Sequence, residues 1–126
     1  VVHDATQHFS MPKNLALHQW ALAGDWRIDA ESAALQSAQG ALTIKFYGRD
    51  VNLVMGAANG KTTRYRVTLD GKAPNTAHGL DSDAQGAGVI TGQRLYQLLR
   101  LPAAGEHELR IEFLDSGADV FAFTFG

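Results

Sequence analysis

The chain has 126 residues, of which 45% are hydrophobic and 19% are charged, and its formal net charge is −2 at pH 7. This length and composition are typical of one globular domain with a core of its own. A weakly negative chain is not expected to bind nucleic acid or an anionic membrane, because both partners require basic surfaces. No apolar run is long enough to insert into a bilayer. The absence of cysteine excludes disulfides, thiol chemistry and thiolate metal ligands from this segment.

In the first third of the chain, the apolar segment LALHQWAL at 15–22 predicts a strand buried on both faces. The alanine-rich segment 29–39 predicts a short strand followed by a turn. Trp26 follows a Gly-Asp pair and is interpreted as a core residue in preference to a binding platform.

Regular alternation of apolar and polar residues appears in the middle of the chain. It predicts strands at 41–48 and 50–56, with a break between them at Gly48-Arg49-Asp50. A third alternating run at 63–71 ends at Asp70-Gly71, a dipeptide that tolerates positive φ and predicts a tight turn.

Three more strands are expected toward the C-terminus, at 94–101, 107–113 and 119–126. The first two are separated by a predicted turn at Pro102-Ala103-Ala104-Gly105, and the last carries three phenylalanines on one face. Seven to nine short strands without an amphipathic helix indicate an all-β, jelly-roll-like β-sandwich and no second domain.

Motifs of enzymes are not found. No serine lies in a G-x-S-x-G sequence, the five histidines lack the spacing of zinc ligands, and no dinucleotide-binding glycine motif joins a strand to a helix. We therefore expect no catalytic residue, no cofactor and no metal in this segment.

The stretch AHGLDSDAQGAG at 77–88, here called the polar loop, combines two aspartates and a histidine with three glycines. Asp81 and Asp83 precede Gly86 as in a calcium loop, but Gln85 and Gly92 stand where an EF-hand needs further ligands. The favoured interpretation is a solvated turn whose aspartates accept hydrogen bonds from nearby backbone amides.

Sugar-binding sandwiches combine a flat aromatic ring with fixed polar groups. The outward positions of the alternating strands offer such groups at Tyr47, Arg64, Arg66 and Arg110, whereas the direction of Trp20 and Tyr96 is not fixed by the pattern. The alternative is that Arg64 and Arg66 only solvate a sheet face.

Several stretches resemble one known family. They include RYRVTLDGKAP, HGLDSDAQGAGVITGQRLYQLLR and the closing FAFTFG. They are similar to the C-terminal domain of DipZ-type proteins, which are bacterial cytochrome c biogenesis and thiol–disulfide proteins. In that family a thioredoxin-like domain is followed by a β-sandwich that resembles galactose-binding and carbohydrate-binding modules. The resemblance implies a linker from that upstream domain at 1–10 and the sandwich domain at 11–126.

The resemblance also implies a periplasmic or extracytoplasmic location and a non-catalytic accessory role, with a glycan as the expected ligand. The alternative is a module that docks onto the thioredoxin-like domain or its redox client. A sugar site predicts an exposed aromatic ring beside Arg or Asp, and a docking module predicts an exposed apolar patch without a sugar-sized pocket. The candidate ligand-binding residues are His78, Asp81, Asp83, Arg94, Tyr96 and Gln97 in the most specific stretches, together with Arg66 and Tyr47 on the outward face.

Overall fold

The computed structural model describes residues 6–126, which contain eight strands and two single-turn 3-10 helices. The strands are β1 (Thr6–Phe9), β2 (Trp20–Ile28), β3 (Ala33–Leu35), β4 (Gly40–Ala57), β5 (Thr63–Leu69), β6 (Ala87–Ile90), β7 (Arg94–Phe113) and β8 (Ala118–Phe125). The short helices are η1 (Ala58–Gly60) and η2 (Asn75–Ala77). The prediction of an all-β sandwich is confirmed.

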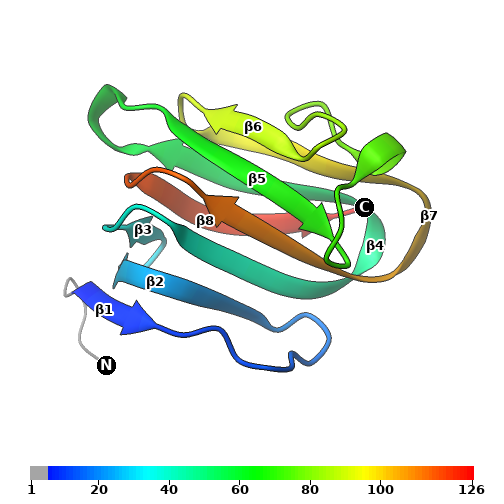
Figure 1. The fold of residues 1–126 in the computed structure, drawn as a ribbon, viewed down its shortest axis with the longest axis horizontal. Coiled ribbons are helices and arrows are strands. Elements are labelled where there is room, and N and C mark those ends of the chain that lie inside the picture. Colours follow the sequence, from blue (N-terminus) through cyan, green and yellow to red (C-terminus); the bar gives the residue numbers. More distant parts are fainter. Residues whose placement is uncertain (1–5) are drawn as a thin grey trace.

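The two long strands β4 and β7 build both layers of the sandwich (Figure 1). All pairings are antiparallel, in the order β1-β2-β3-β8-β4-β7-β5-β6. The first half of β4 pairs with β2, and its second half pairs with β8. Strands β2 and β8 thus lie on the same edge of β4 but in opposite layers, and β7 occupies the other edge of β4 in both layers.

A bulge marks the point where the chain passes from one layer to the other. Gly48 faces Gly105 and Asp50 faces Arg100, so the four residues 101–104 lie opposite the single residue Arg49. The predicted turn at 102–105 is therefore wrong, because β7 continues through it. Its proline is tolerated since a bulge leaves residues without ladder partners.

The predicted strand at 15–22 is wrong for residues 15–19. His18 adopts a φ of +63°, and the Gln19 amide donates to the Ala16 carbonyl at 2.9 Å, which makes a turn before β2 begins. The turn predicted at Asp70-Gly71 is confirmed, with φ of +52° and +80° at the two residues.

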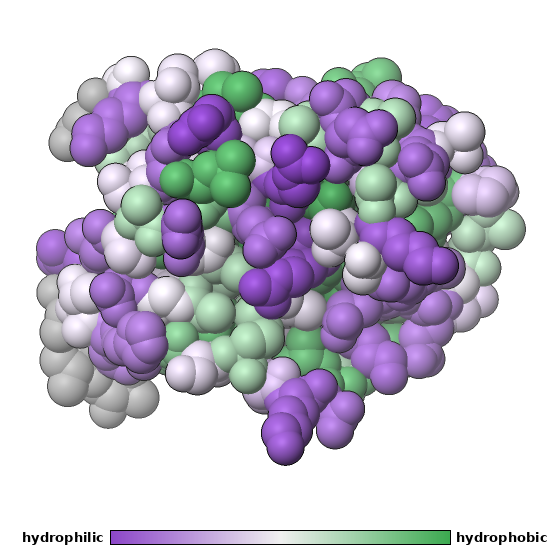
Figure 2. Space-filling view, viewed as in Figure 1, coloured by the Kyte–Doolittle hydropathy of each residue, from purple (hydrophilic) through white to green (hydrophobic). Residues whose placement is uncertain are grey.

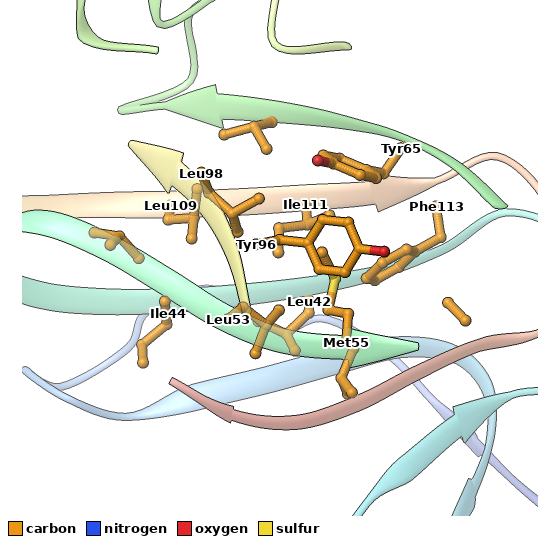
Figure 3. Packing of buried hydrophobic residues seen from close by; sticks show 14 of the residues in the cluster. Leu42, Ile44, Leu53, Met55, Tyr65, Tyr96, Leu98, Leu109, Ile111 and Phe113 are labelled. Carbon is orange, nitrogen blue, oxygen red and sulfur yellow. The ribbon is translucent and has the colours of Figure 1, made fainter. Parts of the chain in front are cut away.

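The core lies between the layers, and the inward-facing residues of β4, β5 and β7 form its largest part (Figure 3). Leu53, Ile111 and Phe113 are among its fully buried side chains, each contributing about 1.5–3 kcal/mol by burial. Trp26 has no exposed surface, and its Nε1 donates to the Ala23 carbonyl at 2.8 Å. The interpretation of Trp26 as a core residue is confirmed.

Strand β1 lies within the range expected to be a linker and pairs with β2. Residues 1–5 of that linker lie outside the described residues, and the origin of 1–10 as a link from an upstream domain stays a prediction. In the described part of the chain, no helix has the length and apolar character needed to cross a bilayer.

Candidate functional site

The polar loop lies along the first half of β7 and is bonded to it through the backbone. The Gly79 amide donates to the Leu98 carbonyl, and the Asp81 amide donates to the Gln97 carbonyl, both at 3.0 Å. The buried hydroxyl of Ser82 donates to the same Leu98 carbonyl at 2.8 Å. The loop is therefore an ordered crossover.

Asp81 is the side chain that binds this loop most firmly. Its carboxylate accepts two hydrogen bonds from Arg94, at 2.7 and 3.1 Å, and a third from the Gln97 amide at 2.8 Å. The hydrogen bonds from Arg94 lower the pKa of Asp81, against the opposing effect of burial, and the Gln97 amide adds to the lowering. Arg94 also lies 3.8 Å from the centroid of the Tyr96 ring. Four of the predicted residues therefore lie in one cluster.

The polar atoms of this cluster are already engaged by the protein. Tyr96 is fully buried, and its hydroxyl donates to the Gly92 carbonyl at 2.6 Å and accepts the Thr91 amide at 3.0 Å. Its ring has no exposed face on which a sugar could stack. The cluster of Asp81, Arg94 and Tyr96 holds the loop to β7.

The remaining two candidates in the loop point elsewhere. One oxygen of Asp83 accepts the amides of Gln85 and Ala87, each at 2.9 Å. This is the side-chain-to-backbone bonding favoured from the sequence, and it is confirmed for Asp83. His78 is exposed and lies beside the carbonyl of Gly79. Within residues 6–126, no group of three or more His, Asp or Glu side chains is placed to hold a metal.

A second set of polar side chains gathers on the outer face of the first layer. They line a hollow of about 450 Å³, which we call the outer-face hollow. Its polar lining residues are Gln39, Arg66, Arg110 and Glu112, and small residues such as Ala41 form its floor. In Figure 2 hydrophilic side chains cover the middle of this face, next to a band of weakly hydrophobic residues.

Strand register explains why these side chains meet. Arg66 of β5 lies opposite Glu112 of β7, which in turn lies opposite Ala41 of β4. Side chains at directly opposed positions share one face of the sheet. Arg110 lies two residues before Glu112 and therefore also faces outward.

The arginines of this face differ in their partners. Arg64 forms a two-pronged ion pair with Asp115, at 2.8 and 3.0 Å, which lowers the pKa of that carboxyl to about 2. Arg110 has a single longer contact of 3.8 Å with Glu112. Arg66 forms no side-chain hydrogen bond or ion pair with any of the described residues, although its backbone pairs within the sheet. Its guanidinium is thus available to a ligand.

Tyr47 is the exposed aromatic residue of the same face, with 56% of its surface accessible. It lies six residues after Ala41 on β4, which corresponds to about 20 Å. The Lys45–Glu106 ion pair, at 3.4 Å, lies between them. Tyr47 and Arg66 therefore occupy opposite ends of one face.

An apolar groove, whose position the sequence did not indicate, opens between the layers beside β8. It has a volume of about 220 Å³ and is lined by residues that include His18, Trp20, Phe121, Phe123 and Phe125; we call it the aromatic groove. Trp20 is 49% exposed at its mouth. The phenylalanines were expected to share one face of a strand, but the pattern contains no sign that this face is only partly covered.

Comparison with known proteins identifies the family of this chain. The family model described as "Thioredoxin like C-terminal domain" matches residues 1–126. The chain belongs to this family. It is 29% identical over 125 residues to Protein DipZ of Mycobacterium bovis, and equally to Protein DipZ of Mycobacterium tuberculosis. The match covers 94% of this chain and 15% of each relative, so the chain corresponds to a small part of those proteins.

Two solved structures share the fold. A family two carbohydrate esterase from Cellvibrio japonicus superposes with a TM-score of 0.63 at 17% identity, over 84% of this chain and 30% of that one. A family two carbohydrate esterase from Clostridium thermocellum, solved with cellohexaose, gives a TM-score of 0.65 at 15% identity, over 86% of this chain and 31% of that one. At these identities the likeness describes the fold alone.

Proposed function

We propose that this chain is a non-catalytic accessory domain of a periplasmic or extracytoplasmic thiol–disulfide protein, and that it binds carbohydrate at the outer-face hollow. The observation that carries the proposal is the presence of Arg66 and Arg110 in the lining of one hollow. Both were expected to face outward from the sequence alone. The family supports the accessory role, since its description, "Thioredoxin like C-terminal domain", names a C-terminal domain.

The chemistry of the hollow suits a ligand rich in hydroxyl groups. Two guanidiniums donate hydrogen bonds, the Glu112 carboxylate accepts them, and the Gln39 amide does both. The alanines of the floor leave room for a ring to approach the sheet. A longer saccharide lying along β4 would reach Tyr47, whose exposed ring offers a surface for stacking.

The same lining supports binding in preference to hydrolysis. Among the described residues, those that line the hollow include no serine, cysteine or histidine that could act as a nucleophile or its base. The esterase activity in the names of the two structural relatives is a property of those proteins, and the match covers less than a third of each.

A second candidate function, contact with a polypeptide, rests on a different surface. The aromatic groove is lined by no Asp, Glu, Lys or Arg among the described residues, and Trp20 is half-exposed at its mouth. An exposed apolar surface of this kind is typical of protein contacts.

Calorimetric titration of the domain with soluble cell-wall glycan fragments and common oligosaccharides tests the carbohydrate proposal. Once a ligand is found, Arg66→Gln and Arg110→Gln should each weaken its binding about tenfold, the cost of losing a charge-assisted hydrogen bond. Arg100→Gln is the matched control, because Arg100 is an exposed arginine of β7 in the other layer. Unchanged affinity in the double variant, or loss of binding in the control, would remove the hollow as the site.

A further inference from the structure

The two layers of the sandwich are unequal beside β4. In the first layer β2 pairs with β4, and β1 follows beyond β2. In the second layer β8 pairs with β4, and β3 reaches only Asp119 and Val120 of its other edge. In Figure 1, β1 and β2 form the lower edge of the molecule, and β8 does not extend over them. On this side of β4, and along residues 121–125, the second layer therefore has one strand fewer than the first.

The outer edge of β8 is open from residue 121 to residue 125. The described residues supply no backbone partner on this side. The five residues are Phe, Ala, Phe, Thr and Phe, without a charge or a proline. Proteins usually protect an open edge with charged residues or proline, because the unpaired amides and carbonyls of the edge are a template for another strand.

Apolar side chains lie beneath the position that a strand added to the open edge of β8 would occupy. The aromatic groove borders a second hollow of about 330 Å³, lined by residues that include Phe9, Trp20, Leu22 and Ile28, and Trp20 belongs to both. Phe123 and Phe125 stack at a centroid distance of 5.8 Å on the groove side of β8. His18 and Ser10 are the polar side chains of the combined surface in the described chain, so it carries no fixed charge from Asp, Glu, Lys or Arg.

We infer that the open edge of β8 binds an extended, uncharged segment of another polypeptide as an added strand. The unpaired backbone of 121–125 would bond its backbone, and the aromatic groove would take its alternate apolar side chains. A glycan lacks the regularly spaced amides that the edge requires. An unfolded or loosely folded client polypeptide has them.

A second folded copy of this chain fits the edge poorly. Antiparallel pairing of β8 with the β8 of another copy places both first layers on the same side of the joined sheet. Because β1 and β2 of each copy extend past β8, the two overhangs would occupy the same space. A single strand fills the gap without this clash.

The test uses the 126-residue domain and a short soluble peptide of alternating valine and threonine, flanked by lysines. Binding should protect alternate amides of 121–125 from hydrogen exchange. It should also shift the tryptophan emission to the blue, since Trp20 is half-exposed and Trp26 is fully buried. The same peptide, N-methylated on the edge that faces β8, keeps its side chains but should bind at least about tenfold more weakly.

Variants of the domain separate the groove from the rest of the surface. Trp20→Ala should weaken peptide binding about tenfold, whereas Leu80→Ala, at an exposed position of the polar loop, should leave it unchanged. Equal binding of the N-methylated peptide would overturn the inference. So would self-association of the domain without peptide, seen by sedimentation, if it protects the amides of 121–125 from hydrogen exchange. Amide chemical-shift changes in the aromatic groove on addition of an oligosaccharide would assign the groove to a glycan and would also overturn the inference. Arg66→Gln should not alter peptide binding, so this test and that of the outer-face hollow fail independently.

Discussion

Arg94 and Asp81 are joined by two hydrogen bonds of 2.7 and 3.1 Å, and the same carboxylate accepts the amide of Gln97 from β7. One side chain of the polar loop thus contacts both a side chain and the backbone of the neighbouring strand. This makes Asp81 the main anchor of the longest crossover in the described chain.

Replacing this anchor should destabilise the domain. Asp81→Asn removes the ion pair and should lower the free energy of unfolding by about 1–2 kcal/mol, a modest value because half of the Arg94 side chain is exposed. Urea denaturation measures the change. Asp115→Asn is the matched control, since it breaks the more exposed ion pair with Arg64 and should cost less. A larger loss in the control would contradict this account of the loop.

The contribution of Asp81 should also depend on pH. Arg94 lowers the pKa of Asp81 in the folded state below its value of about 3.9 in an unfolded chain. The stabilisation is therefore fully present above that unfolded value and is lost as the pH falls through the folded pKa. The difference in unfolding free energy between the parent domain and Asp81→Asn should be constant from pH 7 to pH 5 and shrink below about pH 4. A difference that grows on acidification would refute the assignment.

Gly86 is expected to tolerate no side chain. Its φ is +88°, and a Cβ placed there would lie 1.9 Å from the Val67 carbonyl oxygen. Gly86→Ala should lower the free energy of unfolding by at least about 3 kcal/mol or prevent folding. Gly92→Ala, where a Cβ meets no heavy atom within 4 Å, should change stability by less than about 0.5 kcal/mol. Similar melting temperatures for the two variants would show that the close approach at β5 is not required.

Thr43 offers a stabilising substitution. Its side chain is buried, and its Oγ1 has no hydrogen-bond partner among the described residues. Thr43→Val keeps the shape and removes the unpaired hydroxyl, so it should raise the free energy of unfolding by about 1 kcal/mol. Thr63→Val is the opposite case, because that buried hydroxyl donates to the Ser116 carbonyl at 3.2 Å, and it should lower stability. Thermal denaturation of both variants compares their stabilities. A loss of stability in Thr43→Val would contradict the claim that the unpaired hydroxyl destabilises the fold.

The parts of the fold that local patterns encode were predicted from the sequence. Alternation at 63–69 and 107–113 gave strands with the expected inward faces, because one buried face imposes period two. The turn at Asp70-Gly71 follows from residues that accept positive φ. Two strand boundaries were predicted wrongly because composition does not reveal their local causes. His18 adopts a left-handed backbone conformation within an apolar run, and a bulge allows Pro102 to lie within a strand.

The candidate site was harder to predict because it depends on pairing between distant strands. Arg66 and Arg110 were correctly expected to face outward, but only the register of β5 on β7 brings them to one hollow. The sequence pattern does not fix the direction of Tyr96, a candidate ligand-binding residue; its side chain is buried, and its hydroxyl is bonded within the Thr91–Gly92 turn. The open edge of β8 is likewise a property of strand order, which no local pattern contains.

The most direct test of the carbohydrate proposal is an amide chemical-shift titration of this domain with soluble cell-wall glycan fragments and common mono- and oligosaccharides. The account predicts saturable shifts that cluster at Arg66, Arg110 and Glu112, with weaker shifts toward Tyr47 for longer saccharides. Shifts confined to the polar loop and Arg94 would contradict the assignment of the site to the outer-face hollow and would favour the candidate residues of the polar loop. Silence across the whole panel would contradict carbohydrate binding itself.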